Sequence, residues 1–228
     1  MYRDHTVAVV VPAYNEAGFV GAVIDQLPTF VDRAYLVDDG STDETWTEIG
    51  EHAETRNATH QGTFDDLVVP IRHNENRGVG GAIKTGYLRA RDDEIELTAV
   101  MGGDGQMPPD LLEKILKPVV DGRAGYAKGN RLINAETRDM PRFRYVGNNI
   151  LSYLTKVASG YWGVSDPQNG FTAIAREALE RLDLDELYED YGFSNELLVR
   201  LNAANVRVAE VPHPPVYGEE ESHIQYTR

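Results

Sequence analysis

The segment from Thr98 to Asp110 reads Thr-Ala-Val-Met-Gly-Gly-Asp-Gly-Gln-Met-Pro-Pro-Asp, and the interpretation of the whole chain starts from it. A short apolar run ends at Gly102 and Gly103, which is typical of a buried strand followed by a sharply bent backbone. Asp104 and Gln106 come next and place two oxygen ligands at the carboxyl end of that strand. The segment therefore predicts a strand that delivers polar groups to a site.

Asp104 and Gln106 are the candidate metal ligands. Carboxylate and amide oxygens suit a hard divalent cation, Mg²⁺ or Mn²⁺, that keeps some water ligands and shares the phosphates of a substrate. The alternative is a polar loop with an Asx-type turn, and this segment alone does not choose between the two. Pro108 and Pro109 follow, and they predict that a helix begins there.

The composition narrows the class of protein. The chain has 228 residues, no Cys and a formal net charge of −15. Thiolate metal sites and a Cys nucleophile are excluded, and general nucleic-acid binding is disfavoured because it needs a basic surface. The acidic, Lys-poor composition suits either a salt-rich cytoplasm or an ordinary acidic enzyme. No apolar run approaches the roughly 18 residues that span a bilayer, and we expect no signal peptide.

Short apolar runs alternate with helical periodicity through the first 131 residues. We expect buried strands at 7–11, 34–37, 67–71 and 97–101. Ser41 or Thr42 is expected to cap the helix after the second strand, and the polar stretch 52–66 is expected to be a surface connection. The alternation predicts an α/β fold with a mainly parallel sheet, helices on both faces, and a ligand site at the carboxyl ends of the strands.

Four loops with acids, amides and glycines follow those predicted strands, and together they indicate a nucleotide site. The loops are 12–16, 38–43, 73–81 and 102–106. In the second half we expect strands at 126–129 and 206–211, a loop at 165–171 that enters another strand, and helices at 177–182 and 195–203. The stretch 140–159 has apolar residues near helical spacing and a basic opposite face. It is either a helix packed on the sheet or one that rests partly on a membrane.

Five motifs in the first 131 residues occur in the order found in the inverting glycosyltransferases of family 2, which the chain resembles. They are Val-Pro-Ala-Tyr-Asn-Glu (11–16), Val-Asp-Asp-Gly-Ser-Thr-Asp (37–43), Asn-Arg-Gly-Val-Gly-Gly-Ala (76–82), Asp-Gly-Gln with the following Pro-Pro (104–109) and Gly-Asn-Arg (129–131). The resemblance implies one GT-A domain with a nucleotide-sugar half (1–131), an acceptor half (132–213) and a mobile tail (214–228). Looser motifs at 166–171, 193–198 and 217–224 resemble enzymes that transfer a hexose to polyprenyl or dolichyl phosphate.

The resemblance also implies roles by position. The residues expected to bind the nucleotide sugar are Pro12, Tyr14, Glu16, Val37, Asp39, Gly80, Gly81, Gly103, Asp104, Gln106 and Arg131. An aromatic ring offers a stacking face, and acids accept hydrogen bonds from ribose hydroxyls or ring N–H groups. Helix capping is the alternative role for Asp38 and Asp39. The family's metal motif usually reads Asp-x-Asp, and Gly102 stands in place of its first acid. We therefore expect weak metal capture without the donor diphosphate.

The implied reaction is an in-line displacement at the anomeric carbon with inversion, and its candidate catalytic residues are Asp104, Asp166 and Glu196. A sugar hydroxyl acceptor would need a general base, either Asp166 or Glu196, unless these are structural acids. A phosphate acceptor is mostly dianionic at neutral pH and needs no strong base. Cations would then position it, namely Arg131 with Arg142 or Arg144.

Three functions stay open at this point. The first is hexosyl transfer from UDP-hexose or GDP-mannose to polyprenyl or dolichyl phosphate, with peripheral contact at the cytoplasmic membrane face and no nucleic-acid partner. The others are transfer to a hydroxyl of a growing glycan and a non-catalytic nucleotide-sugar-binding module. The five histidines at 5, 52, 60, 73 and 213 show no metal-ligand spacing, and we assign them no role. His223 stands where several relatives carry Lys, and we expect it to be a surface residue.

Overall fold

The computed structural model describes residues 1–131, 153, 155–190 and 192–214. The strands are β1 (Val7–Ala13), β2 (Arg33–Asp38), β3 (Val68–Arg72), β4 (Leu97–Val100), β5 (Tyr126–Asn130), β6 (Thr172–Ala175) and β7 (Val208–Pro212). The helices are α1 (Val20–Asp25), α2 (Thr45–Ala58), α3 (Gly78–Asp92), the 3₁₀ turn η1 (Pro109–Leu111), α4 (Leu112–Val120), α6 (Arg176–Leu179) and α7 (Phe193–Ala203). The residues Arg142, Arg144 and His223, most of 140–159 and all but the first residue of the predicted tail lie outside the described residues.

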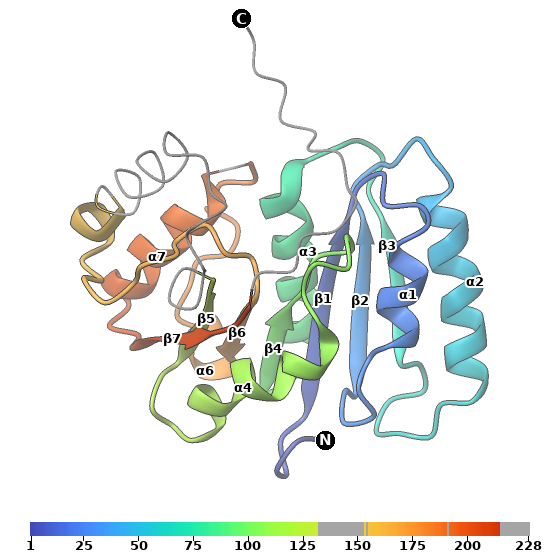
Figure 1. The fold of residues 1–228 in the computed structure, drawn as a ribbon, viewed down its shortest axis with the longest axis horizontal. Helices are drawn as coiled ribbons and strands as arrows, with labels where there is room; N and C mark the ends of the chain where they lie inside the picture. The colour runs from blue at the N-terminus through green and yellow to red at the C-terminus, as the bar shows by residue number, and fades with distance from the viewer. Residues whose placement is uncertain (132–152, 154, 191, 215–228) are drawn as a thin grey trace, which may run out of the picture.

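The strands form a seven-stranded sheet in the order β3-β2-β1-β4-β6-β5-β7 (Figure 1). β1 pairs in parallel with both β2 and β4, and β2 pairs in parallel with β3. β6 runs antiparallel to β4 and to β5, and β7 is parallel to β5. The prediction of a mainly parallel α/β sheet is confirmed, with β6 as its single reversed strand among those described.

Both faces of the sheet are covered, which explains why β1 is apolar at nearly every position. Successive strand residues point to opposite faces, so Val9 and Val11 join one core while Ala8 and Val10 join the other. The first core is closed by α1, α2 and α4, and the second by α3, α6 and α7. These two layers fix the strand ends, from which the site loops emerge.

The start of α2 differs from the prediction. The helix begins at Thr45, and the carboxylate of Asp43 accepts the Thr45 N–H at 3.0 Å. Ser41 and Thr42 do not cap it, because both bond to Asn15 in the loop after β1. The helix also continues to Ala58, so the first half of the predicted surface connection is helical. The predicted helix start at the Pro-Pro pair is confirmed by η1.

Strands β3 and β7 lie at the two edges of the described sheet, and each contains a proline, Pro70 and Pro212. None of the helices in the described ranges has the length and apolar character that crossing a bilayer demands.

Candidate functional site

The carboxyl ends of β1, β2 and β4 meet at one edge of the sheet, because these strands are parallel neighbours. Main-chain bonds join the loops there: Asp39 N donates to Ala13 O at 2.9 Å, and Gly103 N donates to Pro12 O at 3.1 Å. β5 runs in the same direction as β4, since both are antiparallel to β6, so Arg131 also falls at this edge. The structure thus brings Arg131 to the same edge of the sheet as the loops after β1, β2 and β4.

Asn15 ties the loop after β1 to the loop after β2. Its N–H donates to Ser41 Oγ at 2.9 Å, and its side-chain oxygen accepts the Thr42 N–H at 2.9 Å. The next residue, Glu16, donates its N–H to Thr45 Oγ1 at 2.8 Å. Tyr14 remains 41% exposed beside these hydrogen bonds, so part of this residue is accessible to a ligand.

Asp39 is buried and its orientation is fixed by two donors. His73 Nδ1 lies 2.6 Å from Asp39 Oδ1, and the N–H of Arg77 donates to the same oxygen at 2.9 Å. His73 Nε2 lies 2.9 Å from Thr85 Oγ1 on α3. Both of these hydrogen bonds to Asp39 are accepted by Oδ1. Sequence reasoning gave His73 no role, although its place directly after β3 put it at the predicted edge.

Three of the predicted nucleotide-binding positions have packing roles within the protein. The side chain of Val37 is fully buried in the second core, and the contact of this residue with a nucleotide stays a prediction. A Cβ atom on Gly80 would lie 2.7 Å from both Glu189 O and Phe193 Cβ. Gly81 N donates to Glu189 O at 2.9 Å. The glycines let α3 approach Glu189 and Phe193 closely, and their contact with a nucleotide stays a prediction.

Gly80→Ala is expected to lower the free energy of unfolding by about 1–3 kcal/mol, because the added methyl group meets backbone that cannot move aside easily. Gly50→Ala in α2 is the matched control, since a Cβ there meets nothing within 4 Å. It should raise stability by about 0.5–1 kcal/mol through helix propensity. Urea unfolding of both variants tests this, and equal effects would contradict the packing assignment.

Asp104 and Gln106 form the Asx-type turn that was the alternative to a metal site. Asp104 Oδ1 accepts the Gln106 N–H at 3.0 Å. A Cβ atom at position 102 would lie 2.8 Å from that same oxygen, so Gly102 gives the carboxylate the room to fold back over the main chain. The turn and a metal role are compatible, because one carboxylate oxygen still takes no hydrogen bond from the described residues.

The donor set around Asp104 fits a divalent cation only if a ligand completes it. No group of three or more acidic or histidine side chains in the described ranges is arranged to hold a metal. One carboxylate and one amide oxygen are far fewer than the six ligands Mg²⁺ prefers, and Mg²⁺ sites of this kind rely on waters and substrate phosphates. Asp104 and Gln106 are therefore suited to share an ion with a bound diphosphate.

Asp166 and Arg131 form a two-pronged ion pair across the site. Arg131 Nε lies 2.9 Å from Oδ2 and Nη2 lies 3.0 Å from Oδ1, while the Arg131 N–H also donates to Oδ2. Asp166 is 5% exposed and Arg131 is 43% exposed. Burial would raise the pKa of Asp166, but the hydrogen bonds and charge of Arg131 lower it below the ordinary value. The carboxylate is thus ionised at neutral pH and a weak base.

Glu196, the other predicted base, lies on α7 and has both oxygens engaged. Oε1 accepts from Arg200 at 2.7 Å, and Oε2 accepts the N–H of Tyr188 at 2.6 Å. This pairing joins α7 to the segment before it. The structure therefore gives Glu196 structural contacts, and its catalytic role remains a prediction.

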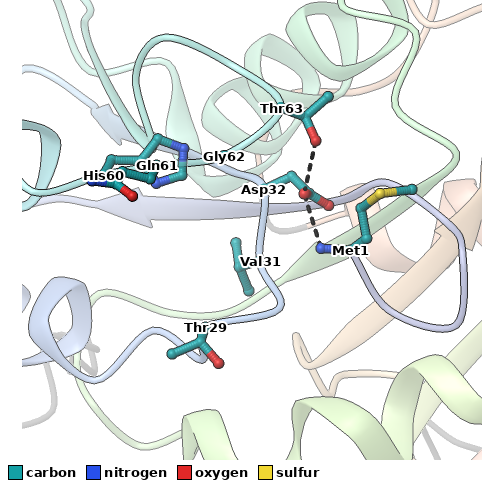
Figure 2. Close-up of a pocket in the computed structure, with 8 residues that line it drawn as sticks. All are labelled: Met1, Thr29, Val31, Asp32, His60, Gln61, Gly62 and Thr63. Carbon is teal, nitrogen blue, oxygen red and sulfur yellow. Dashed lines mark hydrogen bonds and ion pairs between the residues drawn. The ribbon is translucent and has the colours of Figure 1, made fainter.

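A cavity of about 470 Å³ lies beside Asp32, the residue just before the amino end of β2, and Figure 2 shows the residues that line it. Asp32 lines it and accepts bonds from the Met1 amino group at 2.9 Å and from Thr63 Oγ1 at 3.5 Å. Ligands of open α/β sheets bind at the carboxyl ends of the strands, so this cavity is not the nucleotide site.

The chain is similar to known glycosyltransferases. The family model described as "Glycosyl transferase family 2" matches residues 8–183. A protein of Methanococcus voltae named UDP-N-acetylglucosamine--dolichyl-phosphate N-acetylglucosaminyltransferase is 31% identical over 95% of this chain and 88% of its own length. A dolichol-phosphate mannosyltransferase of Pyrococcus furiosus is 25% identical over 90% of this chain, which spans 55% of that protein.

A solved structure shares the fold. Glucosyl-3-phosphoglycerate synthase from Mycobacterium tuberculosis, crystallised with Mn²⁺, UDP and phosphoglyceric acid, superposes with a TM-score of 0.68. The match has 19% sequence identity and covers 96% of this chain and 72% of that one. At this identity the likeness establishes the shared α/β architecture and nothing about substrates.

Proposed function

Because the chain belongs to glycosyl transferase family 2, we propose that it transfers a hexose from a UDP- or GDP-linked sugar to a polyprenyl or dolichyl phosphate. The observation that carries the acceptor assignment is the Arg131–Asp166 pair, in which a buried carboxylate holds a half-exposed guanidinium at the site edge. The names of the relatives from Methanococcus voltae and Pyrococcus furiosus, both dolichyl-phosphate enzymes, point to the same acceptor class.

The donor site is proposed to lie along the ends of β1, β2 and β4. Tyr14 would stack on the base, and Asp39, held through Oδ1 by His73, would accept from the base or ribose with its other oxygen. Asp104 and Gln106 would face the diphosphate and hold Mg²⁺ or Mn²⁺ with it. Such an ion, when bound, stabilises the negative charge that develops on the leaving nucleoside diphosphate.

The acceptor needs a cation more than a base in this proposal. A phosphate monoester has its second pKa near 6, so it is mostly dianionic at neutral pH and can attack without losing a proton. An Arg guanidinium carries five N–H donors in a fixed planar arrangement that matches the oxygens of a phosphate. Asp166, whose pKa is lowered, serves better to orient Arg131 than to accept a proton.

A transfer assay tests the proposal. Purified protein with Mn²⁺ or Mg²⁺ and polyprenyl phosphate is mixed in parallel with labelled UDP-glucose, UDP-N-acetylglucosamine and GDP-mannose, and label is counted in the organic phase. We expect label from one donor, its loss with a chelator, and none when polyprenol without phosphate replaces the acceptor. The polyprenol control separates a phosphate acceptor from a hydroxyl acceptor in the same lipid.

The absence of organic-phase label would reject the lipid acceptor. A thermal-shift measurement would then show whether the protein still binds a nucleotide sugar. A nucleotide sugar at about 100 times its dissociation constant should add roughly 2.7 kcal/mol of stability. Stabilisation without lipid transfer would favour a glycan hydroxyl acceptor or a non-catalytic binding module. Sedimentation of the protein with anionic vesicles tests the proposed peripheral contact with the cytoplasmic membrane face.

A further inference from the structure

Lys128 lies in the middle of β5 and is 1% exposed. Its neighbours across the sheet are Thr172 on β6 and Glu210 on β7. The ammonium group donates a hydrogen bond to the carbonyl of Asn169, in the loop that precedes β6. A charge inside a sheet is costly unless it is paired and hydrogen-bonded, so the surroundings of Lys128 should show what it is paired with.

Side chains of both charge signs lie near this ammonium group. Asp166 and Glu210 are the nearby acids, and Arg131 is the nearby cation. Glu210 also accepts the N–H of Asp166 at 3.1 Å and the side-chain amide of Asn130 at 2.7 Å. The group thus comprises two cations and two carboxylates, which come from β5 and the residue after it, from the 165–169 loop and from β7.

The loop that Lys128 holds is the loop that carries Asp166. Asn169, whose carbonyl bonds to Lys128, donates its own N–H to the carbonyl of Asp166 at 3.3 Å. Its side-chain amide lies 3.4 Å from Asp166 Oδ2 and 2.6 Å from His213 Nε2. Lys128 is therefore linked through Asn169 to the carboxylate that orients Arg131. Lys128 itself is too deeply buried to touch a ligand.

We propose that Lys128 is a positioning residue for the acceptor phosphate: its buried ammonium holds the 166–169 loop and supplies the positive charge that keeps Asp166 paired with Arg131. The inference rests on the proposed function, in which Arg131 contacts that phosphate. Both the hydrogen bond to Asn169 and the charge are required, because the bond fixes the loop and the charge balances the buried carboxylate of Asp166 and the partly buried one of Glu210.

The charge has a pH dependence that a structural role alone would not produce. Burial lowers the pKa of Lys128 to about 8, opposed by Asp166 and Glu210 and assisted by Arg131. His213, on the other side of Asn169, also has a lowered pKa, chiefly through burial, and is neutral well below pH 8. Deprotonation of Lys128 therefore removes the positive charge as the pH rises through about 8.

The test compares wild type with Lys128→Gln, which keeps a hydrogen-bond donor and loses the charge. We expect the KM for polyprenyl phosphate to rise on the order of 10- to 100-fold, and the KM for the nucleotide sugar to stay within about twofold. Wild-type transfer should decline above about pH 8, and this decline should be absent in the variant. Lys84→Gln is the matched control, because Lys84 is also buried and bonds to a carbonyl, that of Asp185.

An unchanged acceptor KM in Lys128→Gln would overturn the inference, and so would equal rises in the KM for the donor and the KM for the acceptor. If that variant does not fold, the pH dependence of transfer is measured with Lys128→Arg instead. An arginine keeps its charge throughout the range, so the alkaline decline should disappear, and an unmoved decline would reject the role of Lys128. The absence of transfer by wild type itself would instead reject the proposed function, so the two failures are distinguishable.

Discussion

Asp104→Ala is expected to reduce sugar transfer by about 100- to 1000-fold, which is the scale of losing one group that stabilises developing charge. Asp104 is the one carboxylate of the Asx turn at the end of β4, and no cluster of three acids or histidines in the described chain can replace it as a metal ligand. Initial rates measured against Mn²⁺ and Mg²⁺ concentration should show that the remaining activity no longer saturates with metal.

The matched control for this prediction is Asp110→Ala, which removes an exposed acid a few residues further along, in η1. It should leave the rate and the metal dependence as they are in wild type. Turnover of Asp104→Ala at the wild-type level would refute the metal assignment. Gly102→Asp should not improve the enzyme, because the new Cβ lies 2.8 Å from the Asp104 oxygen and displaces that carboxylate.

Asp166→Asn is expected to lower kcat/KM for the lipid phosphate by roughly 100-fold, through misplacement of Arg131. An amide offers one neutral acceptor oxygen where the carboxylate offers two charged ones to the guanidinium. The loss should appear mainly as a higher acceptor KM, and Arg131→Lys, which keeps the charge but not the fork, should behave similarly. Steady-state kinetics with each substrate varied in turn measures both effects.

The same variant separates the two acceptor chemistries. If Asp166 were a general base for a sugar hydroxyl, Asp166→Asn would collapse kcat and leave the acceptor KM nearly unchanged. Asp183→Asn, a change of an exposed acid outside the site, controls for the loss of one negative charge and should be neutral. A kcat collapse confined to Asp166→Asn would therefore replace the phosphate acceptor by a hydroxyl acceptor.

The sequence was most informative about the sheet. Runs such as Val7–Val11 are apolar at every position because helices cover both faces, and this pattern identified β1 to β4 as strands of a mainly parallel sheet. The ends of helices were harder to predict, since any of four neighbouring polar residues suits a cap. The Asn15 bonds to Ser41 and Thr42 decided that the helix starts at Thr45.

Site residues that directly follow a strand could be predicted from the sequence. Contacts between residues far apart in the sequence could not. Asp39, Asp104 and Arg131 each follow a recognisable strand segment. The pairing of Arg131 with Asp166 joins positions 35 residues apart, and nothing in local spacing encodes it. Lys128 was hidden within a short strand, because a buried lysine and an exposed lysine look alike in a sequence without knowledge of β6 and β7.

The prolines in the two edge strands bear on the behaviour of the protein at high concentration. An edge strand presents main-chain groups that can pair with the edge of another molecule, and this is a route to aggregation. Proline has no N–H, so Pro70 and Pro212 interrupt the row of donors on β3 and on β7. With a net charge of −15 adding mutual repulsion, sheet-to-sheet growth between copies is discouraged at both ends.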